Sequence, residues 1–231
     1  MVRVSVVIPA YNEEKTIIEI LEKIAAQQIE GIEFETVVID DGSKDETVAR
    51  VKARPELFDK LIEQPVNQGK GAAVMAGIRS ASGEYILFQD ADLEYDPADY
   101  DRLLRPVQSH DADIVMGSRL IAPEVTRVHY FWNKVGNRFI TLLFNILHNT
   151  TFTDIYSCYL VYRRSLVDPD RLTAKGWGQQ AEILSMAVAA ANVIYEAPIS
   201  YHGRTYADGK KIRAHHVLDV VTMMVRTRFG L

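Results

Sequence analysis

Short apolar runs alternate with helix-like patterns along the first half of the chain. The runs predict β-strands at residues 3–8, 36–40, 61–62, 85–89 and 113–117. Between them, apolar residues spaced three or four apart predict helices: one after an N-cap at Asn12, one after a capping box from Ser43 to Glu46, and two over residues 70–81 and 98–108. This alternation predicts an α/β fold with a mostly parallel central sheet and helices on both faces.

The second half of the chain has a less regular pattern. Its main feature is an apolar stripe that predicts an amphipathic helix over residues 131–146, made of Phe131, Trp132, Val135, Phe139, Leu142, Leu143 and Ile146. Such a stripe suits either a helix that lies in a membrane interface or one that packs on the sheet. Two further strands are predicted at residues 159–162 and 193–195, and a last helix at residues 213–229.

Composition narrows the class of protein. The 231 residues are 48% hydrophobic and 25% charged, and no Pro/Gly/Ser-rich linker divides them, so we expect one domain. The net charge of -5 argues against a nucleic-acid binder, which usually carries a basic field. The single cysteine, Cys158, excludes an internal disulfide and a Cys-rich zinc site, and we expect it to be a small buried residue in an apolar strand.

The distribution of apolar residues also bears on location. The amino-terminal residues read as a strand and not as a signal peptide, and no apolar run approaches the ~20 residues that cross a bilayer. We therefore expect a cytoplasmic protein, with the inner face of the membrane as a place where it can attach.

Acidic residues gather after the predicted strands, at the edge of the sheet where ligands bind in α/β folds. Asp40 and Asp41 follow the second strand, and Asp90, Asp92 and Glu94 follow the strand at residues 85–89. Three carboxylates on one loop repel each other unless a cation joins them. Oxygen ligands of this kind suit Mg2+ or Mn2+, which complete their coordination with water and substrate phosphates. The sequence therefore predicts a divalent metal bound by Asp90, Asp92 and Glu94 that bridges a diphosphate.

Competing phosphate-binding patterns are missing. No G-x-G-x-x-G follows the first strand, and no G-x-x-x-x-G-K-[ST] occurs anywhere. Residues 67–71 (NQGKG) contain glycines and a lysine, but not at the spacing of a P-loop. A dinucleotide-dependent dehydrogenase and a P-loop NTPase are therefore poor fits.

Four motifs then follow one another along the chain: VVIPAYNEE at residues 6–14, DDGS at 40–43, NQGKG at 67–71 and DAD at 90–92. This series resembles the family 2 glycosyltransferases of GT-A fold, and within them the branch of dolichol- or polyprenyl-phosphate mannose and glucose synthases. Shorter matches at residues 117–119, 136–137, 199–204 and 209–211 extend the resemblance over nearly the whole chain. It implies one catalytic domain over residues 1–231, with a nucleotide-sugar-binding half (1–117) and an acceptor-binding half (118–231) that includes interfacial helices.

The resemblance also implies roles for individual residues. Those expected to hold the nucleotide sugar are Pro9, Tyr11, Glu13, Asp40, Lys70 and Asp90. Asp90 and Asp92 would bind the metal, and Glu94 falls where relatives often carry Gln. Arg119 would face the sugar or its diphosphate, and Asp154 the sugar hydroxyls. Arg204 and Lys211, with Lys210 beside it, would neutralise the acceptor phosphate and the departing diphosphate.

The expected reaction is a single inverting displacement at the anomeric carbon of GDP-mannose or UDP-glucose. A polyprenyl phosphate acceptor is already anionic and needs no strong base, whereas a soluble or saccharide hydroxyl needs one, for which Asp154 and Glu182 are candidates. Both acceptors remain open from the sequence, as does a non-catalytic nucleotide-sugar-binding module. A nucleotidyltransferase is a poorer fit, because residues 9–14 lack a glycine-rich, basic loop.

Overall fold

The computed structural model describes residues 1–121, 131–176, 178–203 and 216–230. Its strands are β1 (Val2–Ala10), β2 (Ile32–Asp40), β3 (Lys60–Glu63), β4 (Tyr85–Phe88), β5 (Ile114–Ser118), β6 (Leu160–Arg163) and β7 (Ile194–Pro198). Its α-helices are α1 (Ile17–Ala25), α2 (Thr47–Lys52), α3 (Lys70–Ser80), α4 (Tyr100–His110), α5 (Phe131–His148), α6 (Gln179–Ala190) and α7 (His216–Phe229). Short 3-10 helices lie at Pro55–Leu57, Pro97–Asp99, Arg164–Leu166 and Pro169–Arg171.

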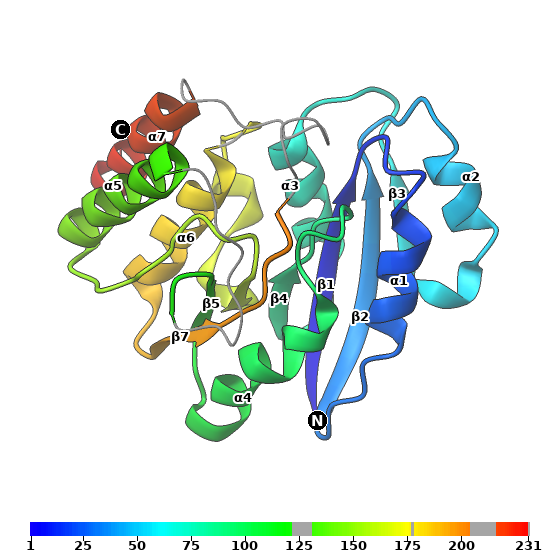
Figure 1. The fold of residues 1–231 in the computed structure, drawn as a ribbon, viewed down its shortest axis with the longest axis horizontal. Coiled ribbons are helices and arrows are strands. Elements are labelled where there is room, and N and C mark those ends of the chain that lie inside the picture. The colour runs from blue at the N-terminus through cyan, green and yellow to red at the C-terminus, as the bar shows by residue number, and fades with distance from the viewer. Residues whose placement is uncertain (122–130, 177, 204–215, 231) are drawn as a thin grey trace.

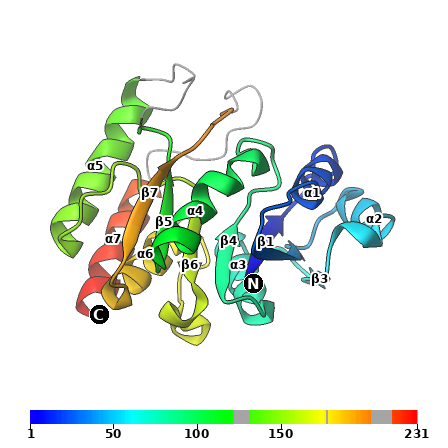
Figure 2. The same ribbon diagram turned by 90° about the horizontal axis from the view of Figure 1, so that it is seen from below.

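The strands form one seven-stranded sheet in the order β3-β2-β1-β4-β6-β5-β7. All neighbouring pairs are parallel except those of β6, which runs antiparallel to both β4 and β5. Helices α1 and α4 cover one face of the sheet, and α3 and α6 cover the other (Figures 1 and 2). The predicted α/β fold with a mostly parallel sheet is confirmed.

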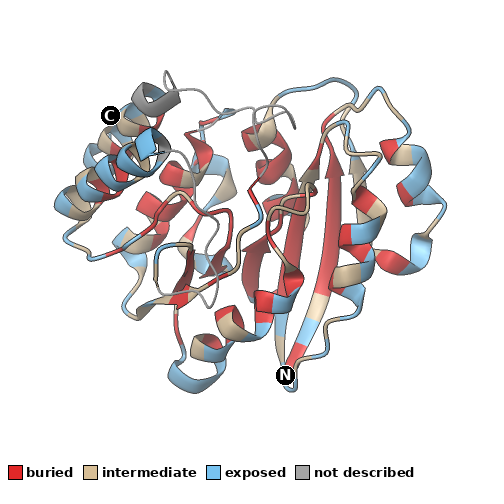
Figure 3. Cartoon of the chain, viewed as in Figure 1, coloured by how far each residue is buried: buried red, intermediate tan, exposed pale blue. Residues whose placement is uncertain are grey.

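The core lies within and directly beside the sheet, as the buried strands of Figure 3 show. β4 is buried along its whole length, and Val6, Val7 and Ile8 of β1 have no exposed surface. Strands buried on both faces read as continuous apolar runs, which explains why the runs in the first half located them well.

A buried carboxylate lies within this core. Glu35 of β2 is 1% exposed, and its carboxylate accepts hydrogen bonds from the Ser5 hydroxyl and from both the amide and the hydroxyl of Ser82. The ammonium of Lys60 lies 2.8 Å from the same carboxylate. Burial opposes its charge, but these partners outweigh burial and lower the pKa of Glu35 to about 2. We call Glu35, Ser5, Lys60 and Ser82 the Glu35 cluster.

Two predicted helix starts are wrong. Helix α1 is preceded by Thr16, and Asn12 instead has a left-handed backbone (φ 55°) and accepts a hydrogen bond from Lys44 N. Helix α2 begins after Glu46, while the hydroxyl of Ser43 accepts from Asn12 N and caps nothing. Both side chains join two loops to each other, because Asn and Ser bond neighbouring backbone as readily as they cap helices.

Helix α5 has two apolar sides. Ile140 and Phe144 are buried where α5 packs on α6 and α7, whereas six of the stripe residues remain exposed: Phe131, Trp132, Val135, Phe139, Leu142 and Ile146. Packing therefore uses the opposite side of the helix from most of the predicted stripe. Within the described residues, no helix combines the length and the apolar character needed to cross a bilayer.

Candidate active site

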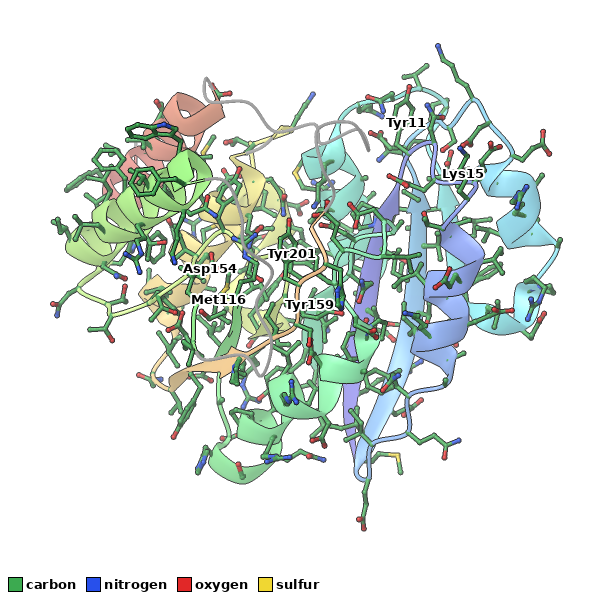
Figure 4. All side chains as sticks on the ribbon, viewed as in Figure 1. Tyr11, Lys15, Met116, Asp154, Tyr159 and Tyr201 are labelled. Carbon is green, nitrogen blue, oxygen red and sulfur yellow. The ribbon has the colours of Figure 1, made fainter. Side chains whose placement is uncertain are left out.

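The candidate residues follow the carboxyl ends of β1, β2 and β4, which lie next to one another in the sheet (Figure 1). The loops after β1 and β2 are tied together, since Asn12 N donates to Ser43 Oγ (2.9 Å) and Glu13 N donates to Thr47 Oγ1 (2.9 Å). Pro9 is the next-to-last residue of β1, and Tyr11 directly follows the strand, at its end in Figure 4. The residues expected to hold a nucleoside thus share one corner of the sheet.

Asp40 stands out in this corner. It is 4% exposed, and Oδ2 accepts a hydrogen bond from Ser43 N (3.0 Å). Its other oxygen, Oδ1, is buried and finds no hydrogen-bond partner among the described residues. Since buried polar atoms are nearly always paired, this oxygen suits a donor supplied by a ligand.

The NQGKG motif at residues 67–71 is a packing device. Asp41 accepts hydrogen bonds from Gln68 N (2.8 Å) and Gly69 N (2.9 Å), and Gly71 N donates to Lys175 O (2.9 Å). A Cβ at residue 71 would lie 2.2 Å from Ala174 O, and Gly69 has φ 95°. The glycines therefore permit close contact with the backbone of residues 174–175.

This packing directs the lysine of the motif toward the carboxylates. Lys70 forms an ion pair with Asp90, and its side chain is 35% exposed. Burial opposes the positive charge, but Asp90 and Asp92 outweigh burial and raise the pKa of Lys70. The Lys70 ammonium therefore lies against Asp90, and the charge of Asp92 acts on it as well.

Residues 90–95, here called the carboxylate loop, carry all three predicted metal ligands. Glu94 Oε2 accepts a hydrogen bond from the hydroxyl of Tyr201 (2.7 Å), and its carbonyl accepts from His202 N (2.9 Å). Across the part of the chain that the structure describes, no three His, Cys, Asp or Glu side chains are grouped as a metal site, so the expected three-carboxylate set is not assembled. Asp90, which pairs with Lys70, and Asp92 on the same loop still provide the oxygen donors that Mg2+ or Mn2+ prefers.

Arg119 and Asp154 bind each other. The guanidinium donates to both carboxylate oxygens (2.7 and 2.9 Å), to Tyr156 O (3.0 Å) and to the Tyr95 hydroxyl (3.3 Å), and it lies 5.0 Å from the centre of the Tyr201 ring. Asp154 has no exposed surface. Figure 4 shows Asp154 and Tyr201 in the middle of the molecule, away from Tyr11. Among the residues that the structure describes, this pair joins the loop after β5 to the chain before β6.

Glu182, the other candidate base, is also committed to the protein. It is 3% exposed, and its carboxylate accepts hydrogen bonds from Thr173 N (2.9 Å), Thr173 Oγ1 (2.8 Å) and Ala174 N (2.9 Å). It therefore holds the segment against which Gly71 packs. The sequence pattern did not predict the helix that carries it, α6, because apolar and polar residues are mixed around that helix and form no 3.6-residue stripe.

Cys158 is buried, as predicted, but it lies in a turn before β6 and not in a strand. It is close to the candidate site: burial, together with the charge of Asp90, raises the pKa of its thiol well above the usual range. A lone cysteine in an apolar run carries no sequence signal for such a position. The predicted phosphate-binding residues Arg204, Lys210 and Lys211 lie outside the described residues.

The model of glycosyl transferase family 2 matches residues 5–169, and the chain belongs to this family. Among solved structures, glucosyl-3-phosphoglycerate synthase from Mycobacterium tuberculosis in complex with Mn2+, UDP-glucose and phosphoglyceric acid has a TM-score of 0.70 at 20% identity, covering 100% of this chain and 80% of that one. The GT-A fold expected from the motifs is therefore confirmed.

Two curated relatives are more than 30% identical to this chain. The chain is 31% identical over 207 residues to the low-salt glycan biosynthesis hexosyltransferase Agl6 of Haloferax volcanii (87% of this chain, 48% of the relative). It is 35% identical over 171 residues to the undecaprenyl-phosphate 4-deoxy-4-formamido-L-arabinose transferase of Pseudomonas aeruginosa (71% of this chain, 48% of the relative). The chain thus spans about half the length of these relatives.

Proposed function

We propose that this chain is a metal-dependent, inverting hexosyltransferase that moves a sugar from GDP-mannose or UDP-glucose to a polyprenyl phosphate. The observation that carries the proposal is the ion pair between Lys70 and Asp90 on the carboxylate loop, at the carboxyl end of a central strand. Sites of this composition bind diphosphates through a divalent ion. The similarity to the undecaprenyl-phosphate 4-deoxy-4-formamido-L-arabinose transferase supports the acceptor class.

The nucleoside would occupy the corner formed by Pro9, Tyr11, Glu13 and Asp40. The buried Oδ1 of Asp40 is an acceptor that suits an N–H of a base or an O–H of a ribose. Asp90 and Asp92 would hold Mg2+ or Mn2+, which supplies charge neutralisation to the leaving diphosphate. Lys70, already in contact with Asp90, adds a second positive charge beside that diphosphate.

In the transfer itself, an acceptor oxygen forms a bond to the anomeric carbon while the bond from that carbon to the diphosphate oxygen breaks. The electron pair of the broken bond leaves with the nucleoside diphosphate. A phosphate acceptor brings its own negative charge, so the protein must align two anions, a task suited to Arg204 and Lys211.

The two candidate bases favour this acceptor over a neutral hydroxyl. Asp154 is held by Arg119, and Glu182 is held by Thr173 and Ala174, so each carboxylate already accepts several hydrogen bonds inside the protein. A hydroxyl acceptor would need a carboxylate that reaches its proton. We therefore place the soluble or saccharide hydroxyl second.

A lipid acceptor requires contact with a membrane, and we assign that contact to the exposed side of α5. Trp132 and Ile146, at the two ends of the stripe, are 77% and 70% exposed. The charged residues of α5 are the exposed Lys134 and Arg138, and the helix contains no Asp or Glu. An aromatic and apolar face flanked by cations suits the surface of an anionic bilayer.

A thermal-shift screen of GDP-mannose, UDP-glucose and UDP-GlcNAc, each with and without Mn2+, tests the donor site. We expect one donor to raise Tm in the presence of Mn2+, because a ligand that binds only the folded state stabilises it. The shift should disappear in Asp92→Ala and persist in Asp101→Ala, an acid of α4 that pairs with Arg105 at the surface.

The selected donor is then assayed with polyprenyl phosphate and with saccharide acceptors. Transfer only to the lipid phosphate supports the proposal, and transfer only to a hydroxyl replaces the acceptor. Donor binding without transfer or hydrolysis indicates a non-catalytic nucleotide-sugar-binding module, and the lack of any donor shift contradicts the proposal as a whole.

A further inference from the structure

Gln89, which directly follows β4, has no exposed surface and yet carries a polar amide. Its Nε2 donates hydrogen bonds to Asp90 O (3.0 Å) and to Tyr95 O (3.3 Å), the carbonyls at the two ends of the carboxylate loop. One side chain thus binds both ends of the loop. No motif in the sequence singles out this residue.

Two buried hydroxyls fix the amide from the other side. Tyr100 Oη and Tyr159 Oη each donate to Gln89 Oε1 at 2.8 Å, and both tyrosines have no exposed surface. Carbonyl oxygens can only accept hydrogen bonds, so Nε2 must face Asp90 O and Tyr95 O, and the orientation of the amide follows from its partners. All four hydrogen bonds of the amide are therefore made within the protein.

The loop between the two carbonyls needs such support. Leu93 has φ 62°, a left-handed conformation that is unfavourable for a residue with a Cβ. Asp92 Oδ1 accepts a hydrogen bond from Glu94 N (3.1 Å) across this turn, which aims the carboxylate. Strained backbone persists where the surrounding structure over-determines it, and here the surrounding structure includes the Gln89 amide.

We propose that Gln89 is a positioning residue that sets the affinity of Asp90 and Asp92 for the divalent metal. The inference rests on the proposed function, in which these two carboxylates bind Mg2+ or Mn2+. Gln89 would not touch the metal; it would hold the loop backbone so that the two carboxylates face one ion. Residues that orient metal ligands in this way typically change metal affinity about 10- to 100-fold when replaced.

The test is the dissociation constant of Mn2+, measured by electron paramagnetic resonance of the free ion, first alone and then with GDP or UDP. Gln89→Glu keeps the shape and the acceptor for both tyrosines, but it cannot donate to both Asp90 O and Tyr95 O, because a carboxyl group carries one O–H donor at most. We expect it to bind Mn2+ about 10- to 100-fold more weakly than the unmodified protein. The measurement is made well below the Tm of each variant.

A milder pair of variants keeps the test informative if Gln89→Glu does not fold. Tyr159→Phe removes one hydrogen bond to Gln89 Oε1 and should weaken Mn2+ binding roughly two- to tenfold. Tyr85→Phe is the matched control, because Tyr85 is 1% exposed and its hydroxyl donates to Ala112 O (3.0 Å), a partner outside the loop. It should lose a similar amount of stability and leave the Mn2+ affinity unchanged.

Equal Mn2+ affinities for the unmodified protein, Tyr159→Phe and any folded Gln89 variant would overturn this inference and leave the proposed function intact. Equal losses in Tyr159→Phe and Tyr85→Phe would also overturn it, since the effect would then follow stability alone. If the unmodified protein binds no Mn2+ in any condition, the proposed metal role fails and the inference fails with it.

Discussion

Glu35 and Gln89 are both buried polar side chains with full sets of hydrogen bonds, but they lie toward opposite ends of the central strands. The partners of Glu35 belong to the strands or to the chain that enters them, namely Ser5 in β1, Lys60 in β3 and Ser82 before β4. The partners of Gln89 include the two ends of the carboxylate loop. The first set joins strands to each other, and the second shapes a loop that carries candidate ligands.

The different partners of Glu35 and Gln89 indicate where a buried polar group is expected to affect stability and where it is expected to affect ligand binding. At the amino ends of parallel strands, such a group has only scaffold to hold. At the carboxyl ends, where ligands bind in α/β folds, the same chemistry fixes the residues that touch a ligand. Substitutions at both ends of the strands test whether this division between stability and binding holds.

Arg119 should be the clearest exception to this division. It follows the carboxyl end of β5, where an effect on binding is expected, but it pairs with the fully buried Asp154 and should affect stability. Arg119→Met leaves that carboxylate without its counter-charge, so we expect unfolding free energy to fall by about 3–5 kcal/mol. Urea unfolding measures the loss. Arg105→Met removes an exposed pair with Asp101 and should cost less than about 1 kcal/mol. A similar small cost for both would show that the Arg119 pair adds nothing to stability.

Glu35→Gln should lower stability without affecting Mn2+ affinity. The pKa of Glu35 is depressed from 4.5 to about 2, so its ionised form stabilises the fold above about pH 4.5 and this contribution is lost as the pH falls toward 2. The shift corresponds to about 3 kcal/mol, and the loss of stability over this window should be smaller in the variant. Urea unfolding at pH 7, 5, 3.5 and 2.5 measures it. If the unfolding free energy falls equally with pH in both proteins, the ionised Glu35 does not stabilise the fold.

Gly71→Ala tests the contact between the NQGKG motif and residues 174–175. The added Cβ meets a backbone oxygen at 2.2 Å, so the helix start must shift and we expect a cost of about 1–3 kcal/mol. Because Lys70 shifts too, the donor-induced rise in Tm should shrink. Gly136→Ala is the control: a Cβ there meets nothing within 4 Å, and alanine favours a helix by up to about 1 kcal/mol. If the donor-induced rise in Tm is unchanged in Gly71→Ala, Lys70 does not contribute to donor binding.

Tyr201→Phe should have the smallest effect. It removes the hydrogen bond to Glu94 (2.7 Å) and keeps the ring beside Arg119. We expect the KM for the acceptor to rise roughly two- to tenfold with little change in stability, because one hydrogen bond at a half-buried position is lost. Steady-state kinetics with the acceptor varied measures this, and Glu94→Gln, which keeps an acceptor oxygen, should behave like the unmodified protein. A large loss in Glu94→Gln would indicate that the charge of Glu94 matters on its own.

Much of the fold could be predicted from the apolar pattern. Each predicted strand has its counterpart in β1 to β7, because buried strands of a parallel sheet are apolar throughout. The missing helix α6 is buried on several sides and has no stripe to detect. Asn12 and Ser43 do not cap the predicted helices, because they join two loops that lie more than 30 residues apart in the sequence. A local pattern does not contain such contacts.

The motifs singled out candidate residues for the site, but they did not predict the contacts of those residues. Motif order led to Asp40, Lys70, Asp90 and Arg119, and the structure brings Lys70 and Asp90 together. That Arg119 and Asp154 would bind each other, or that Glu94 would accept from Tyr201, depends on how β5, β6 and β7 are placed side by side. Gln89 is one polar residue after an apolar strand, and its importance becomes clear only from its four hydrogen-bond partners.

The bonds from Tyr201 and His202 to Glu94 have a consequence for the order in which substrates bind. Under the proposed function, the loop that would present Asp90 and Asp92 to the donor also binds Tyr201 and His202, which shortly precede the predicted acceptor-binding residues Arg204 and Lys211 in the sequence. We therefore expect that a donor which fixes the conformation of this loop also forms the acceptor site. This corresponds to a compulsory-order mechanism, in which the nucleotide sugar binds first and the nucleoside diphosphate leaves last. In product-inhibition experiments, the nucleoside diphosphate should then compete with the donor and not with the acceptor.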